Sequence, residues 1–100
     1  MAELLPELCE EICRLLRDEG EYGLAAFLPS MPVVGPCECD GDHCQSFYTA
    51  SRPAGRYGLG HRNIALSPES GMVILDVVHG AIMFVEVLGR PGVKVAIPAC

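Results

Sequence analysis

The 100-residue chain has no tryptophan and few basic residues, with seven lysines and arginines against thirteen aspartates and glutamates. Its formal net charge of −6 argues against nucleic acids and anionic membranes as direct partners, because both bind basic surfaces. No uninterrupted apolar stretch approaches the length of a membrane span, and no basic segment precedes an apolar run at the N-terminus. We therefore expect a cytoplasmic protein without a signal peptide and without membrane association.

Half of the residues are apolar, and no segment rich in proline, glycine or serine is long enough to be a linker. A chain of this length and composition can bury a hydrophobic core, which predicts a single domain over residues 1–100. Six cysteines are fewer than a disulfide-stapled secreted domain of this size contains. In a reducing compartment, clustered cysteines more often bind metal or carry out redox chemistry.

Apolar residues at spacings of three and four positions predict an amphipathic helix over residues 2–19, and a short second helix over residues 22–28. Strand-forming runs follow at residues 63–67, 72–78, 81–88 and 93–97, after a cysteine hairpin whose second arm covers residues 43–49. The predicted fold class is α+β, with the N-terminal amphipathic helix packed on an antiparallel β-sheet of about four to six strands.

The most regular predicted element is the hairpin over residues 72–88, which turns at His79-Gly80. Counting from this turn pairs Val77 with Ile82, Leu75 with Phe84 and Ile74 with Val85. In this register both faces are apolar: one carries Val73, Leu75, Val77, Ile82 and Phe84, and the other Met72, Ile74, Val78, Met83, Val85 and Val87. The long helix can cover one face only, so either the short helix and loops or a second copy of the chain, as a homodimer, must cover the other.

Three cysteines lie in the segment 37–51, around the turn signal Asp40-Gly41. A turn at this dipeptide places Cys37 opposite Cys44, whereas a turn displaced by one residue places Cys39 opposite Cys44. Both registers bring three thiols together, which suggests a Zn²⁺ site. The predicted metal ligands are Cys37, Cys39, Cys44 and His61.

Other interpretations of the cysteines remain open. Cys9 and Cys13, one helical turn apart, are alternative ligands or small buried hydrophobic side chains. The hairpin thiols could instead form a reversible disulfide or remain unliganded. Asp40 and Asp42 disfavour the redox interpretation, because a nearby negative charge opposes formation of a thiolate.

The loop over residues 51–62 carries the one basic patch of the chain, formed by Arg52, Arg56, Tyr57 and Arg62 beside His61. One interpretation is an anion or substrate pocket in which His61 acts as an acid or base. The other is a solvated loop whose arginines balance acidic residues elsewhere.

The segment Cys37–Thr49, the run Gly60-His61-Arg62-Asn63 and the hairpin beginning at Gly71-Met72 carry a family resemblance. Together they resemble a segment of a family of small uncharacterised bacterial proteins, over roughly residues 33–88. The resemblance implies a bacterial, cytoplasmic, single-domain protein and implies no activity.

No sequence pattern of a serine hydrolase, a zinc protease or a phosphate-binding loop is present. We therefore expect a small, acidic, non-enzymatic interaction module of the immunity or adaptor type, with a protein partner and a cysteine hairpin stiffened by zinc. One alternative is a small enzyme or ligand-binding protein that uses the 51–62 loop, for which His61 would have to lie within about 4 Å of Cys44. The other alternative is a thiol redox sensor.

Overall fold

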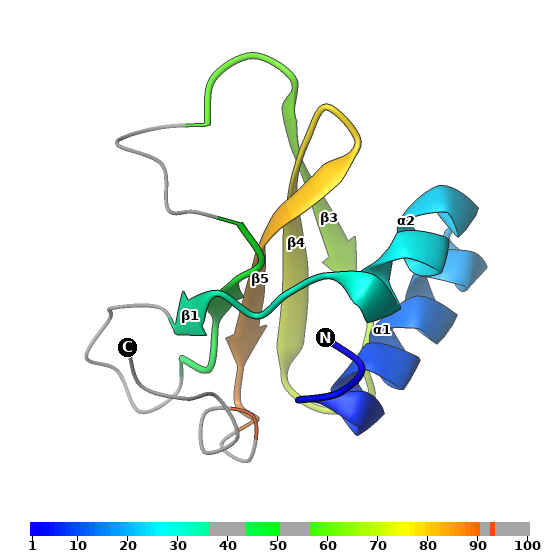
Figure 1. The fold of residues 1–100 in the computed structure, drawn as a ribbon. Helices are drawn as coiled ribbons and strands as arrows, with labels where there is room; N and C mark the ends of the chain where they lie inside the picture. Colours follow the sequence, from blue (N-terminus) through cyan, green and yellow to red (C-terminus); the bar gives the residue numbers. More distant parts are fainter. Residues whose placement is uncertain (37–43, 51–56, 91–92, 94–100) are drawn as a thin grey trace.

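The computed structural model describes residues 1–36, 44–50, 57–90 and 93 (Figure 1). In this part of the chain the elements are α1 (Pro6–Asp18), α2 (Tyr22–Phe27), the 3-10 helix η1 (Leu28–Ser30), β1 (Gly35–Pro36), β2 (Phe47–Tyr48), β3 (His61–Leu66), β4 (Met72–Val78) and β5 (Ala81–Leu88). The strands form one antiparallel sheet in the order β1-β2-β5-β4-β3. The predicted α+β class is confirmed.

Helix α1 begins four residues later than the sequence predicts, at Pro6. The proline explains the difference, because the residue before a proline disfavours helical dihedrals, and Leu5 has the non-helical angles φ −130° and ψ 64°. The helix ends at Asp18, and Gly20 follows with a φ of +80°. Among the described helices, none is long and apolar enough to cross a membrane.

The β4–β5 hairpin turns at His79-Gly80, as predicted. Both residues have positive φ, 50° and 81°, which a type I′ turn requires. The predicted pairing of Val77 with Ile82 is confirmed. Beyond it the register shifts by one residue, because a β-bulge inserts Met83 into β5.

This bulge makes the rest of the predicted hairpin register wrong. Leu75 lies opposite Val85 rather than Phe84, and Ile74 lies opposite Glu86 rather than Val85. Because side chains alternate between faces, every residue of β5 after the bulge lies on the face opposite to the predicted one. The second face is therefore not purely apolar, since it receives the carboxyl group of Glu86.

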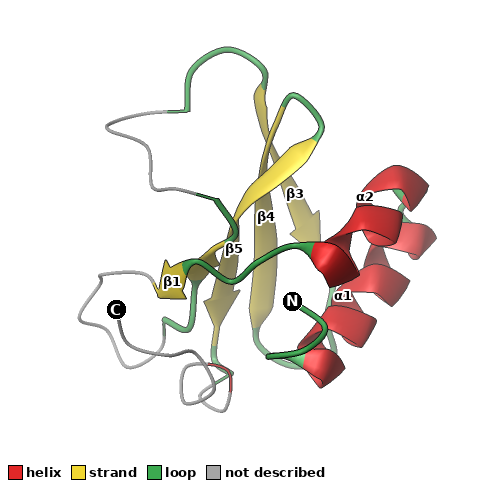
Figure 2. Ribbon diagram, in the orientation of Figure 1, coloured by secondary structure: helices red, strands yellow, loops and turns green. Residues whose placement is uncertain are grey.

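The hydrophobic core lies between the helices and one face of the sheet, and both helices lie on the same side (Figures 1 and 2). Met31 and Val33, in the segment between η1 and β1, pack against this core. The sheet contributes Phe47, Ile64, Leu66, Val73, Leu75, Val77, Ile82, Val85 and Val87 to it. We call this the inner face of the sheet, and the opposite one the outer face.

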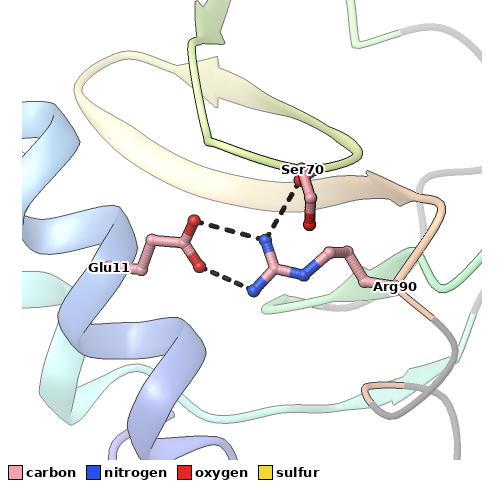
Figure 3. Close-up of polar contacts among 3 residues, drawn as sticks. All are labelled: Glu11, Ser70 and Arg90. Atoms are coloured by element: carbon pink, nitrogen blue, oxygen red, sulfur yellow. Dashed lines mark hydrogen bonds and ion pairs between the residues drawn. The ribbon is translucent and has the colours of Figure 1, made fainter.

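Two arginine–glutamate pairs fasten the sheet to the helical layer. At the end of β5, the guanidinium of Arg90 bonds to both carboxylate oxygens of Glu11 in α1, at 2.7 and 3.2 Å (Figure 3). It also donates to the backbone carbonyl of Ser70 at 3.4 Å, before β4. At the other end of the sheet, Arg62 of β3 bonds to both carboxylate oxygens of Glu21, at 3.0 Å each.

Candidate functional site

A group of aromatic and titratable side chains gathers on the outer face of the sheet. It comprises Tyr48, Tyr57, His61, Asp76, Phe84 and Glu86, which we call the outer-face cluster. Backbone register places its centre: Tyr48 of β2 lies opposite Phe84 of β5, and Phe84 lies opposite Asp76 of β4. Directly opposed residues share a face of a sheet, so these three side chains form one row across three strands.

His61 and Asp76 form the polar core of the cluster. His61 Nε2 lies 2.8 Å from Asp76 Oδ1, across the β3–β4 pair. Asp76 is only 7% exposed, although it lies on the face that the helices do not cover. A buried carboxylate needs a hydrogen-bond partner, and the imidazole of His61 supplies it. The contact is an ion pair when the imidazole is protonated.

Glu86 adds a second carboxyl group, whose side chain hydrogen-bonds to that of Asp76. Burial raises the pKa of Glu86, and the negative charge of Asp76 and their hydrogen bond raise it further, while His61 acts in the opposite direction. Two adjacent carboxyl groups resist simultaneous ionisation. The cluster therefore retains a proton at pH values where an isolated surface glutamate would have lost it.

Two ring pairs border these carboxyl groups. The rings of Tyr48 and Phe84 have centroids 4.4 Å apart and are tilted by 44°. The ring of Tyr57 packs against His61 at 5.0 Å, tilted by 50°. Burial raises the pKa of the Tyr57 phenol, and the charges of Tyr48, Asp76 and Glu86 add to the effect, so Tyr57 stays neutral. Aromatic faces beside carboxyl groups are chemically suited to a cation.

The structure does not bring together the predicted metal ligands that it describes. Cys44 lies opposite Leu88, which pairs with Met72 at the start of β4, whereas His61 pairs with Val78 at the end of β4. At about 3.3 Å per residue the two positions are roughly 20 Å apart along the strand. The contact between Cys44 and His61 that the enzymatic alternative required is therefore absent.

The remaining predicted ligands, Cys37 and Cys39, lie outside the described residues. The described end of this ladder pairs Gly35 with Tyr48, the register that the displaced turn predicts. The Cys44 thiol is half-buried and donates to the Ser46 hydroxyl at 3.4 Å. Across residues 1–36, 44–50, 57–90 and 93, no group of three or more histidine, cysteine or acidic side chains is arranged to hold a metal ion.

Cys9 and Cys13 are buried in α1, in agreement with their interpretation as small hydrophobic side chains. Burial, together with the adjacent Cys13, raises the pKa of the Cys9 thiol to about 11. The Cys13 thiol donates to the backbone carbonyl of Ala25 in α2 at 3.4 Å. A thiol that stays protonated is a poor metal ligand and a poor nucleophile.

The predicted basic patch divides between the two sides of the sheet. Arg62 turns to the helical side and pairs with Glu21, whereas Tyr57 belongs to the outer-face cluster. Arg52 and Arg56 lie outside the described residues. The pairing of His61 with Asp76 is absent from the predicted site, and its only signal in the sequence is that Asp76 and Glu86 are carboxylates within otherwise apolar strands.

A separate hollow of about 310 Å³ lies on the helical side, between Phe27 of α2, Met31 and Ile82 of β5. Among the described residues that line it, none has a titratable side chain, so these residues offer shape and apolar contact.

No family model, no curated protein and no solved structure matches the chain. The candidate site therefore depends on the geometry of the outer face.

Proposed function

We propose that the chain is a small non-enzymatic interaction module that binds a basic protein partner through the outer face of its sheet. The observation that carries this proposal is the outer-face cluster, in which two hydrogen-bonded carboxyl groups lie beside aromatic rings on the face opposite the helices. The net charge of −6 favours attraction of a basic partner over long range.

Apolar side chains next to the cluster supply further contact surface. Met72 and Leu88 lie opposite each other at one end of the outer face, and both are exposed. A protein interface combines apolar anchors with a polar surround, and aromatic residues are enriched in such interfaces. The outer face has this composition, whereas its acidity disfavours a phosphate backbone.

The experiment compares two apolar surfaces in a complex with a purified partner. A protein captured from a lysate is first identified, produced separately and reconstituted with the chain. We expect Met72→Ser, on the outer face, to raise the Kd about tenfold, as loss of an interface anchor does. The control is Tyr22→Ser in α2, because Tyr22 is 67% exposed on the helical side, against 47% for Met72.

The control is expected to change the Kd less than twofold. Loss of binding in Tyr22→Ser with retention in Met72→Ser would place the interface on the helical side and overturn the proposal. An acidic partner would overturn it as well.

Zinc binding by the cysteine hairpin is a separate part of the proposal. We expect about one zinc per chain in untagged protein that is purified with reductant and without chelator, bound through Cys37, Cys39 and Cys44. Metal analysis by mass spectrometry, together with a thiol count, tests it. Metal-free protein whose thiols all react would remove zinc from the proposal and leave the outer face unaffected.

A small enzyme or ligand-binding protein is the second candidate, and the contact between His61 and Asp76 is the observation that favours it. A carboxylate that holds an imidazole in place is a usual arrangement for a general base. In that case turnover or binding of a small molecule would depend on His61, and His61→Gln would abolish it. A stoichiometric complex with a partner, formed by a chain that shows no turnover and binds no small molecule, would favour the interaction module.

A further inference from the structure

We infer that the outer-face cluster is a subsite for one arginine side chain of the partner. Its guanidinium would lie over the Tyr48–Phe84 ring pair and bond to the carboxyl group of Glu86, while the buried carboxyl group of Asp76 adds negative charge beside it. This inference depends on the proposed function and specifies the residue type that the outer face selects.

The row across the sheet supplies the geometry. Phe84 lies between Tyr48 on one neighbouring strand and Asp76 on the other. Glu86 follows Phe84 by two positions on the same strand, so it projects from the same face. A flat cation that covers the aromatic pair is thus adjacent to both carboxyl groups.

His61, on the neighbouring strand β3, fixes the orientation of the Asp76 carboxylate. It holds Oδ1 of Asp76 at 2.8 Å and is itself packed against Tyr57, so the carboxylate has a fixed orientation before a ligand arrives. A negative charge that is fixed in advance costs no ordering entropy when the ligand binds.

Arginine fits this combination better than other cationic side chains. Its guanidinium is planar, stacks on aromatic faces and can bond to two carboxylate oxygens at once, whereas the lysine ammonium is a compact and strongly hydrated point charge. An anion would face two carboxyl groups, and a neutral ligand would leave their charge unopposed.

The test uses the full chain and three hexapeptides with blocked ends, made of arginine, lysine or citrulline, in calorimetry at about 150 mM salt. Citrulline keeps the shape of arginine without its charge. We expect hexa-arginine to bind, hexalysine to bind at least threefold more weakly, and hexacitrulline not to bind.

Two variants locate the subsite. Glu86→Gln should weaken hexa-arginine binding about tenfold, while Phe84→Leu, which keeps an apolar side chain but removes the ring, should weaken it about threefold. The matched control is Glu7→Gln, which removes the same charge from the exposed side of α1 and should change the Kd less than twofold. Circular dichroism confirms that each variant is folded.

Equal weakening by Glu86→Gln and Glu7→Gln would show general attraction to an acidic chain and overturn the subsite. Equal binding of hexa-arginine and hexalysine would overturn the preference for arginine. Either failure leaves the Met72→Ser and Tyr22→Ser comparison intact, since that comparison uses the partner itself. The subsite and the wider interface can therefore fail independently.

Discussion

The two faces of the sheet share the same strands and differ in what they carry. On the inner face, Val73, Leu75, Val77, Val85 and Val87 are fully buried and none of them can ionise. On the outer face, alternate residues of the same strands bring together His61, Asp76 and Glu86. We infer that the inner face accounts for most of the stability, and that the outer face can carry polar groups because a layer of helices covers only one side.

The largest expected difference between the faces is the cost of removing an aliphatic side chain. Leu75→Ala should lower the free energy of unfolding by about 2–5 kcal/mol, because it leaves a cavity in a fully buried site. Ile74→Ala, one residue away on the half-buried outer face, should cost about 1 kcal/mol or less. Urea unfolding of both variants measures the difference. Equal costs would mean that the outer face is packed as tightly as the inner one.

The two ends of the β4–β5 hairpin provide a second comparison, between a glycine just before β4 and a glycine in the turn, which have similar dihedral angles. Gly71 and Gly80 have φ of +73° and +81°, so both favour glycine. A Cβ added at Gly71 would lie 2.4 Å from the Leu88 carbonyl oxygen, whereas one at Gly80 would meet nothing within 4 Å.

Gly71→Ala should therefore destabilise the protein by about 2–3 kcal/mol and Gly80→Ala by about 1 kcal/mol, since only the former adds a backbone clash to the strained dihedral. Thermal unfolding of the two variants tests this, and identical shifts in Tm would show that the hairpin end relaxes freely.

Removing the arginine of the more buried arginine–glutamate pair should cost more stability than removing that of the more exposed pair. We expect this difference to be smaller than the two differences above. The side chains of Arg90 and Glu11 are 23% and 19% exposed, against 51% and 28% for Arg62 and Glu21. Arg90→Ala should cost about 1–3 kcal/mol, because the Glu11 carboxylate and the Ser70 carbonyl lose a charged donor in a partly buried place. Arg62→Ala should cost about 0–1 kcal/mol.

Double-mutant cycles with Glu11→Gln and Glu21→Gln, followed by urea unfolding, isolate the two pair energies. A larger coupling energy for the exposed pair would contradict the comparison.

Sequence periodicity was sufficient for the fold class, because α1 has a regular apolar stripe and the turn at His79-Gly80 is a local signal. The outer-face cluster could not be predicted from sequence periodicity, for two physical reasons. The bulge at Met83 contains no glycine that would indicate it in the sequence. It nevertheless moves both Phe84 and Glu86 from the predicted inner face to the outer face. The order of strands in the sheet is not local either, and it separates His61 from Cys44 by most of the length of β4.

The smallest expected effect concerns the charge on the outer face. The pKa of Glu86 is raised in the folded protein, first by burial and then by Asp76. The folded state therefore binds the Glu86 proton more tightly than the unfolded state does. The stability linked to this proton is complete below the ordinary glutamate value of 4.5 and is lost as the pH rises through the raised pKa.

Glu86→Gln should thus stabilise the protein at pH 8, by less than about 1 kcal/mol for a group that is only partly buried, with little effect at pH 4. Urea unfolding at the two pH values measures the difference, and Glu69→Gln, at an exposed position in the loop before β4, shows what the loss of one surface negative charge contributes. A Glu86→Gln variant that is less stable at pH 8 would mean that the ionised carboxylate is held by partners that outweigh Asp76. The outer face would then be built for its own stability rather than for a ligand.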